Sequence, residues 1–157
     1  MPKPFNAFII ASAIVKNNGQ ILLLEEDRIG ERMLNAPGGR VKPGETPMET
    51  AIREVQEETG VEIRLTSLVA VVQGTWSDGG LFAKFVFDAE KIGGEERAEK
   101  TSVIHWLTPD QIVDPTKRSI PILAVDEAML VEYVTSEKEV TPFFYQYAEN
   151  GFHQNKI

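Results

Sequence analysis

Apolar runs and chain-breaking clusters alternate through the N-terminal part of the chain. Residues 7–15 (AFIIASAIV) are apolar and rich in β-branched side chains, and Asn17-Asn18-Gly19 is typical of a tight turn. Residues 20–25 (QILLLE) are apolar again. This pattern predicts a β-hairpin, followed by a polar loop over 27–35 and a breaker cluster at 36–39.

The strongest helix signal covers residues 47–59. Thr46 is a suitable N-cap, Pro47 suits the first helical position, and Glu49 completes a capping box with Thr46. Gly60 supplies the stop signal. The residues at helical spacing predict a buried stripe formed by Met48, Ala51, Ile52, Val55 and Thr59.

The remainder of the chain alternates between strand and loop patterns before a second long helix. Strands are predicted at 61–72, 81–87 and 102–107, loops at 74–80 and 90–100, a helical turn at 109–113 and an amphipathic helix at 119–135. The tail at 141–157 is aromatic and then polar, and its pattern assigns no element. Without repeats or linkers, we expect one domain over 1–157, with an α/β fold in which helices cover a mixed sheet.

Composition narrows the classes of function. The chain has 157 residues, 24 acidic against 16 basic, a net charge of -8 and no cysteine. The absence of cysteine excludes disulfides, thiolate zinc sites and a cysteine nucleophile. The acidic balance argues against a nucleic-acid partner. No apolar run reaches the roughly 20 residues of a membrane span, and the N-terminus lacks a signal-peptide pattern, so we expect a cytoplasmic protein with no membrane partner.

Three glutamates give the predicted first helix an acidic face. Glu54, Glu57 and Glu58 lie at i, i+3 and i+4 and therefore project from one side. Their mutual repulsion would be relieved by Mg²⁺, which accepts a few carboxylates, keeps waters and completes its shell with substrate phosphate oxygens. On charge pattern alone, the favoured interpretation is a solvated acidic face with Arg53 in i,i+4 ion pairs to residues such as Glu49 or Glu57.

The spacing over residues 39–61 favours the metal site. This segment, GRVKPGETPMETAIREVQEETGV, matches the Nudix box, Gly-x5-Glu-x7-Arg-Glu-U-x-Glu-Glu-x-Gly-U, where U is aliphatic. The matching residues are Gly39, Glu45, Arg53, Glu54, Val55, Glu57, Glu58, Gly60 and Val61. At average residue frequencies, the specified identities would coincide by chance about once in 10⁸ to 10⁹ positions. The chain therefore resembles the Nudix hydrolase family, which implies a Nudix α/β/α sandwich with a mixed β-sheet between helices.

The resemblance implies a metal-dependent hydrolase. Its members use Mg²⁺, with Mn²⁺ as a substitute, to cleave a phosphoanhydride bond of a nucleoside di- or triphosphate or a related pyrophosphate by attack of water on phosphorus. By this resemblance Glu54, Glu57 and Glu58 bind the metal and act in catalysis, and the Gly39 carbonyl is a further metal ligand.

Other residues gain roles from the same resemblance. Glu45 and Arg53 are expected to orient the loop and the glutamates rather than to contact substrate. Glu54 is the expected general base. Because family members differ here, a loop glutamate remains the alternative, and Glu99 is the candidate for this role and for an additional metal ligand.

Three residues outside the box are candidates for substrate binding. Trp76 could stack on a planar ring, while Arg32 and Arg118 could contact phosphate. Each also has a structural interpretation: hairpin packing for Trp76 and a surface ion pair for Arg118. Weaker phosphate candidates are Arg28, Arg40 and Lys84.

Short patterns at 23–26, 73–76 and 117–119 resemble the small-phosphatase branch typified by NudJ, which releases orthophosphate. An alternative activity is MutT-like sanitising of the nucleotide pool, with release of pyrophosphate. A third hypothesis is a nucleotide sensor without catalysis, although such domains usually lose box glutamates that are all present here. The aromatic tail is expected to pack on the domain or to form a homodimer contact.

Overall fold

The structure, a computed structural model, describes residues 7–28, 30–75, 80–136, 143–148 and 151–155. The elements in chain order are β1 (Ala7–Asn17), β2 (Gln20–Arg28), β3 (Glu31–Asn35), β4 (Gly38–Arg40), α1 (Pro47–Thr59), β5 (Glu62–Thr75), β6 (Leu81–Gly93), β7 (Val103–Leu107), α2 (Pro109–Val113), a 3₁₀ turn (Pro115–Lys117), α3 (Ala124–Thr135), β8 (Phe143–Ala148) and β9 (Gly151–Asn155).

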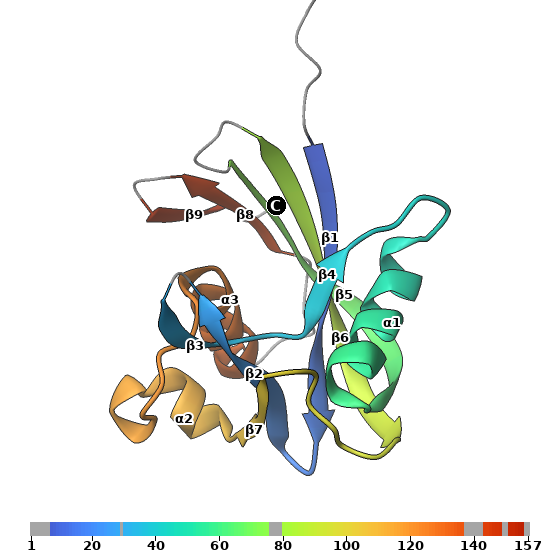
Figure 1. The fold of residues 1–157 in the computed structure, drawn as a ribbon. Coiled ribbons are helices and arrows are strands. Elements are labelled where there is room, and N and C mark those ends of the chain that lie inside the picture. The colour runs from blue at the N-terminus through green and yellow to red at the C-terminus, as the bar shows by residue number, and fades with distance from the viewer. Residues whose placement is uncertain (1–6, 29, 76–79, 137–142, 149–150, 156–157) are drawn as a thin grey trace, which may run out of the picture.

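The strands form one mixed sheet. Its order is β3-β2-β1-β6-β5-β8-β9, while β4 pairs with β1 and β7 pairs with β2. The β1–β6 and β5–β8 pairs are parallel, and the other pairs are antiparallel. Helices α1 and α3 lie on opposite sides of the central strands (Figure 1), which confirms the predicted α/β/α sandwich.

Strand β1 supplies both layers of the core. Ile14 packs in the cluster that contains Met129 and Leu130 of α3, whereas its neighbour Val15 packs in the cluster that contains Val55 of α1. Successive side chains of a strand point to opposite faces, so one buried strand can support two helices. The apolar run at 7–15 reflects this position in the middle of the fold.

Helix α1 begins and ends at the predicted residues. Thr46 and Glu49 form the capping box, and Gly60 closes the helix with a φ of 71°. The predicted buried stripe is wrong at two positions, because Met48 is 54% exposed and Ile52 is 41% exposed. Ile52 lies at the border of the packed face and Met48 in the first turn; the buried residues are Thr50, Ala51, Val55 and Thr59.

In the segment predicted as a loop at 27–35, residues 27–28 and 31–35 are instead strand. β2 continues to Arg28, and β3 pairs with it antiparallel up to the Leu24–Asn35 pair. Gly30, with a φ of 80°, makes the turn and donates its N–H to Asp27 Oδ1 at 2.9 Å. Polar residues fit these strands because this end of the hairpin is partly exposed, so side-chain polarity alone gave the wrong element.

The later elements also differ from their predicted bounds. β6 runs to Gly93, into the predicted loop, and the tail contains β8 and β9, which the pattern did not assign. The last helix begins at Ala124 rather than at 119, because residues 121–123 are extended and exchange two backbone hydrogen bonds with Leu34 of β3. In the described part of the chain, no helix combines the length and apolar character needed to cross a membrane.

Candidate active site

Arg53 lies at the centre of the acidic face of α1. Its Nε and Nη2 donate to the two carboxylate oxygens of Glu45 at 2.7 and 3.0 Å. Its Nη1 donates to Glu54 at 2.5 Å and to Glu57 at 3.0 Å. One guanidinium thus engages three carboxylates and fixes their relative positions, which is the geometry required of an orienting residue. The roles of Arg53 and Glu45 in a reaction remain predictions.

Glu45 ties the loop before α1 to the helix. Besides the bidentate contact from Arg53, its carboxylate accepts hydrogen bonds from Thr50 Oγ1 at 2.8 Å and from the Lys42 amide at 3.1 Å. The Arg53 guanidinium, followed by these two donors, lowers the pKa of Glu45 to about 2. Glu45 is therefore ionised at any physiological pH.

The Glu54 carboxylate lies directly against the backbone of Gly39. A Cβ atom placed on Gly39 would stand 2.4 Å from Glu54 Cδ and 2.5 Å from Oε1. No side chain fits between them while Glu54 keeps its contact with Arg53. Gly39 belongs to β4, which pairs with the middle of β1, so the sheet itself delivers this bare stretch of backbone to the carboxylate.

Glu58 is a partly buried glutamate on the acidic face of α1. One carboxylate oxygen accepts the Gly38 N–H at 2.9 Å. Burial raises the pKa of Glu58 to about 8, and the carboxylates of Glu26 and Glu54 act in the same direction, while the Gly38 N–H and Arg28 oppose them. Burial therefore favours the protonated, neutral form of the carboxyl at this position.

The raised pKa of Glu58 predicts a pH-dependent stability of the metal-free protein. Between the ordinary carboxyl pKa of 4.5 and about 8, the folded protein holds a proton that the unfolded chain has released. The free energy of unfolding should therefore fall as pH rises through this window. Urea unfolding in EDTA at pH 5 and pH 8 measures this fall, which should be smaller in Glu58→Gln. Parallel pH dependences of the wild type and Glu58→Gln would contradict the assignment, and Glu90→Gln on the exposed surface is the control.

The structure adds Glu26 and Asn35 to the surroundings of Glu58. Glu26 accepts hydrogen bonds from Asn35 Nδ2 at 3.0 Å, from Arg28 at 2.7 Å and from Ser102 Oγ at 3.2 Å. The sequence pattern does not predict this group, because the polar residues 27–35 indicate a loop. One signal was available in the sequence: Glu25 and Glu26 are neighbours at the end of a predicted strand, so their side chains must point to opposite faces of the sheet.

Arg32 lies on the other face of the β2–β3 hairpin. It donates to Glu25 Oε1 at 2.8 Å and to the Thr101 carbonyl at 3.3 Å, and Glu25 also contacts His105 Nε2 at 2.7 Å. Glu25 and Glu26 are adjacent in β2 and point to opposite faces. The structure therefore brings Arg28, and not Arg32, to the side of Glu58.

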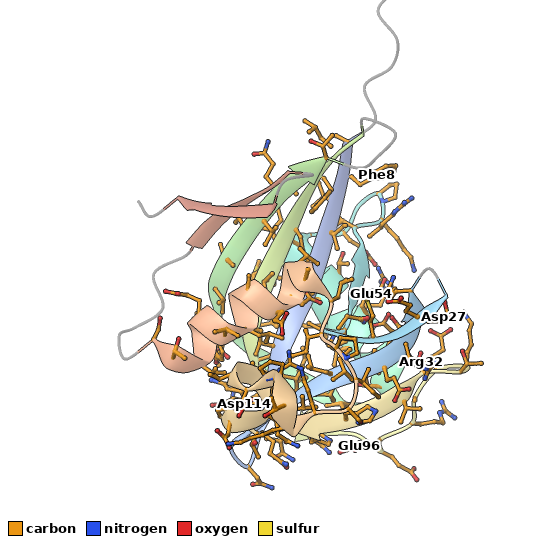
Figure 2. The ribbon with its side chains drawn as sticks, turned by 90° about the vertical axis from the view of Figure 1, so that its left-hand side faces the viewer. Phe8, Asp27, Arg32, Glu54, Glu96 and Asp114 are labelled. Atoms are coloured by element: carbon orange, nitrogen blue, oxygen red, sulfur yellow. The ribbon has the colours of Figure 1, made fainter. Side chains whose placement is uncertain are left out.

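Arg118 is a buried link between two helices. Its side chain is 5% exposed, its Nη1 donates to the Gln111 and Ile112 carbonyls at 2.9 Å, and its Nη2 pairs with Glu127 of α3. Arg118 directly follows the 3₁₀ turn, and Asp114 directly precedes that turn. In Figure 2, Asp114 lies at the lower left, away from Glu54. The structure thus does not bring Arg118 to the acidic face of α1.

Glu99 and Trp76 are the two remaining candidate site residues, and the structure describes only Glu99. The Glu99 amide donates to the Glu58 carbonyl at 2.9 Å, so its backbone lies at the end of α1, while its half-exposed carboxylate pairs with Lys100 at 2.9 Å. Trp76 lies outside the described residues. The role of each in metal or substrate binding remains a prediction.

The donors fit a hard cation in their chemistry. Glu54, Glu57 and Glu58 offer carboxylate oxygens, and Gly39 brings its backbone against one of them. Across the described residues, however, no three acidic or histidine side chains converge closely enough to enclose an ion. The reason is visible in the contacts of Arg53, which hold the carboxylates of Glu54 and Glu57.

Comparison with known proteins places this site in a family. The NUDIX domain model matches residues 7–126. A MutT-like protein from Streptomyces ambofaciens is 33% identical over 110 residues, which cover 69% of this chain and 68% of the relative. Phosphatase NudJ from Escherichia coli (strain K12) is 25% identical over 123 residues, which cover 76% of this chain and 80% of the relative.

Solved structures show the same fold. A MutT protein from Bacillus halodurans superposes with a TM-score of 0.74 at 22% identity, covering 94% of this chain and 97% of that chain. A NUDIX hydrolase from Nitrosomonas europaea superposes with a TM-score of 0.67 at 25% identity, covering 83% of this chain and 88% of that chain. The resemblance predicted from the box and from the NudJ-like patterns is confirmed. The chain belongs to the Nudix family and is a Nudix hydrolase.

Proposed function

We propose that this enzyme uses Mg²⁺, or Mn²⁺ in its place, to hydrolyse a phosphoanhydride bond of a nucleoside di- or triphosphate or a related pyrophosphate. One observation carries the proposal: the acidic face of α1 meets the bare backbone of Gly38 and Gly39, with Glu54 against one glycine and Glu58 bonded to the other. The similarity to phosphatase NudJ, at 25% identity, supports phosphate chemistry.

The residues that would hold the metal are Glu54, Glu57, Glu58 and the carbonyl of Gly39. A bound divalent cation supplies Lewis-acid polarisation of the anhydride and a lowered pKa of a coordinated water. Glu54 would take the proton of the attacking water at its carboxylate, and Arg53 would keep that carboxylate oriented through its 2.5 Å contact. Arg28, which lies on the Glu58 side of β2, is the phosphate-binding candidate that the geometry supports over Arg32 and Arg118.

The substrate class is tested by a product assay on the purified protein. Nucleoside di- and triphosphates, nucleotide sugars, ADP-ribose and thiamine pyrophosphate are incubated with Mg²⁺, and orthophosphate is resolved from pyrophosphate. We expect turnover with Mg²⁺ that disappears in EDTA, with orthophosphate as the product for the best nucleotide. Absence of turnover with both Mg²⁺ and Mn²⁺ across the panel would contradict hydrolysis and favour a nucleotide sensor.

A second candidate activity is the release of pyrophosphate from nucleoside triphosphates. It is favoured by the MutT-like relative, which at 33% identity is more similar over the matched region than phosphatase NudJ. The same assay separates the two activities, because pyrophosphate and a nucleoside monophosphate would then appear together. In either case the proposed partner is a small phosphorylated molecule and not a nucleic acid, in keeping with the net charge of -8.

A further inference from the structure

A buried carboxylate at the start of α3 is bonded to the connection that leads into β4, the strand that carries the two glycines of the site. Asp126 is 1% exposed. Its Oδ1 accepts from Lys84 Nζ of β6 at 2.5 Å, and its Oδ2 accepts the Ala36 N–H at 3.0 Å. A charged group inside a protein is stable only when its oxygens are engaged, so these two contacts fix the Asp126 side chain.

Only Ala36 and Pro37 connect β3 to β4. Asp126 receives the N–H of Ala36, and the Pro37 carbonyl accepts the Ala13 N–H of β1 at 3.2 Å. Proline has no N–H of its own. The connection is thus held at one end by a side chain of α3 and at the other by the central strand, and among the described residues Asp126 is the side chain that anchors it.

The next residues after this connection are those that meet the box glutamates. The Gly38 N–H donates to Glu58 at 2.9 Å, and Gly39 lies against the Glu54 carboxylate. The pairing of β4 with β1 also holds these glycines, and a displacement of Ala36 and Pro37 would strain that pairing and shift both glycines relative to α1, because the connection joins them directly.

The segment before α3 is bonded to the end of β3. Leu34 donates its N–H to the Pro121 carbonyl and accepts the Leu123 N–H, both at 2.8 Å. The start of α3 and the end of β3 are therefore joined at three points: two backbone hydrogen bonds and the Asp126 carboxylate.

We propose that Asp126 is a positioning residue for the metal-binding carboxylates, holding Ala36 so that Gly38 and Gly39 meet Glu58 and Glu54. Asp126 acts through the backbone of residues 36–39, and Lys84 fixes the orientation of its carboxylate. The catalytic consequence rests on the proposed function. The consequence for metal affinity rests only on the metal ligands proposed above, and not on hydrolysis of any substrate.

The test compares two double variants that both lack the ion pair. In Lys84→Gln/Asp126→Asn, an amide oxygen can still accept the Ala36 N–H, and the amide nitrogen can donate to the glutamine. In Lys84→Met/Asp126→Leu, the volume is similar but the acceptor is gone. Mn²⁺ dissociation constants are measured by electron paramagnetic resonance at a temperature where thermal unfolding shows both variants to be folded.

The removal of the acceptor should weaken Mn²⁺ binding by about 10-fold or more, the usual scale for a group that orients metal ligands. The amide pair should recover most of this loss. Unchanged Mn²⁺ affinity in Lys84→Met/Asp126→Leu would overturn the proposal, as would an equal loss in both double variants. A loss of kcat/KM with unchanged Mn²⁺ affinity would also overturn it, because Asp126 would then act on substrate.

Two single variants complete the experiment. Tyr133→Phe removes a different hydrogen bond between α3 and the sheet, the 2.6 Å contact to Asp88, and should lower the midpoint of thermal unfolding without changing Mn²⁺ affinity.

If Lys84→Met/Asp126→Leu does not fold, Asp126→Glu decides: it keeps the charge but shifts the carboxylate by one methylene. A weaker Mn²⁺ affinity in Asp126→Glu supports the proposal, and an unchanged affinity overturns it.

The two proposals fail in different ways. If the wild type binds Mn²⁺ but turns over none of the substrate panel, the proposed function is contradicted, while the Mn²⁺ comparison still decides the role of Asp126. If the wild type turns over substrate but the acceptor variant binds Mn²⁺ normally, only the positioning role is lost.

Discussion

Glu54→Gln should lower kcat for the best substrate by about 1,000-fold, because several kcal/mol of transition-state stabilisation depend on a single metal-ligating and proton-accepting carboxylate. The amide keeps the shape of the side chain, and its oxygen can still accept from Arg53, so the fold should be retained. The assay is steady-state turnover with saturating Mg²⁺, with circular dichroism as the check on folding.

Two matched variants make this result specific. Glu90→Gln removes a carboxylate that pairs with Arg64 on the surface and should change kcat by less than about 3-fold. Glu99→Gln separates the two candidates for the general base. Near-normal turnover in Glu54→Gln together with a severe loss in Glu99→Gln would transfer the role of base from Glu54 to the loop glutamate.

Gly38→Ala should destabilise the protein by about 3 kcal/mol, the range for severe overpacking in a core. A Cβ atom on Gly38 would lie 2.4 Å from the Ala11 carbonyl oxygen and 2.5 Å from Ser12 Cβ. Both atoms belong to β1, the strand shared by the two layers of the core, so neither can move without disturbing both helices. Urea unfolding gives the change in the free energy of unfolding.

Gly93→Ala is the matched control for this substitution. Gly93 is also a strand glycine, but its nearest neighbour would be Glu62 Oε2 at 2.9 Å, the end of a side chain that can turn aside. Its cost should stay below about 1 kcal/mol. Equal destabilisation by the two substitutions would show that strand propensity, and not the contact with β1, decides the requirement for glycine at position 38.

The features best predicted from the sequence are those that depend on contacts between residues close together in the chain. Thr46, Glu49 and Gly60 mark the ends of α1 through contacts within one turn, and the box glutamates follow from the helical repeat. β3 was missed, because its strand character comes from pairing with β2 and not from its own side chains. For the same reason the sequence could not show that Glu26 and Asn35 lie beside Glu58.

Long-range contacts account for the other differences at the site. Arg118 was a candidate for phosphate binding because it precedes the predicted start of the last helix. The helix begins later, at Ala124, because residues 121–123 pair with Leu34. Asp126 and Ala36 are in contact although they lie far apart in the sequence, and no periodic pattern in the sequence predicts this contact. Such contacts depend on how α3 returns to the sheet, which is a property of topology rather than of local sequence.

The parallel pairing of β1 with β6 also has a consequence for how the chain folds. Ala7 pairs with Leu81 and Lys16 with Glu90, so the whole box, α1 and β5 must be synthesised before the central pair can close. On the ribosome, β1 can first pair only with β2 and β4, and its other edge stays open until β6 emerges. Closure of this high-contact-order pair is therefore the expected slow step of folding.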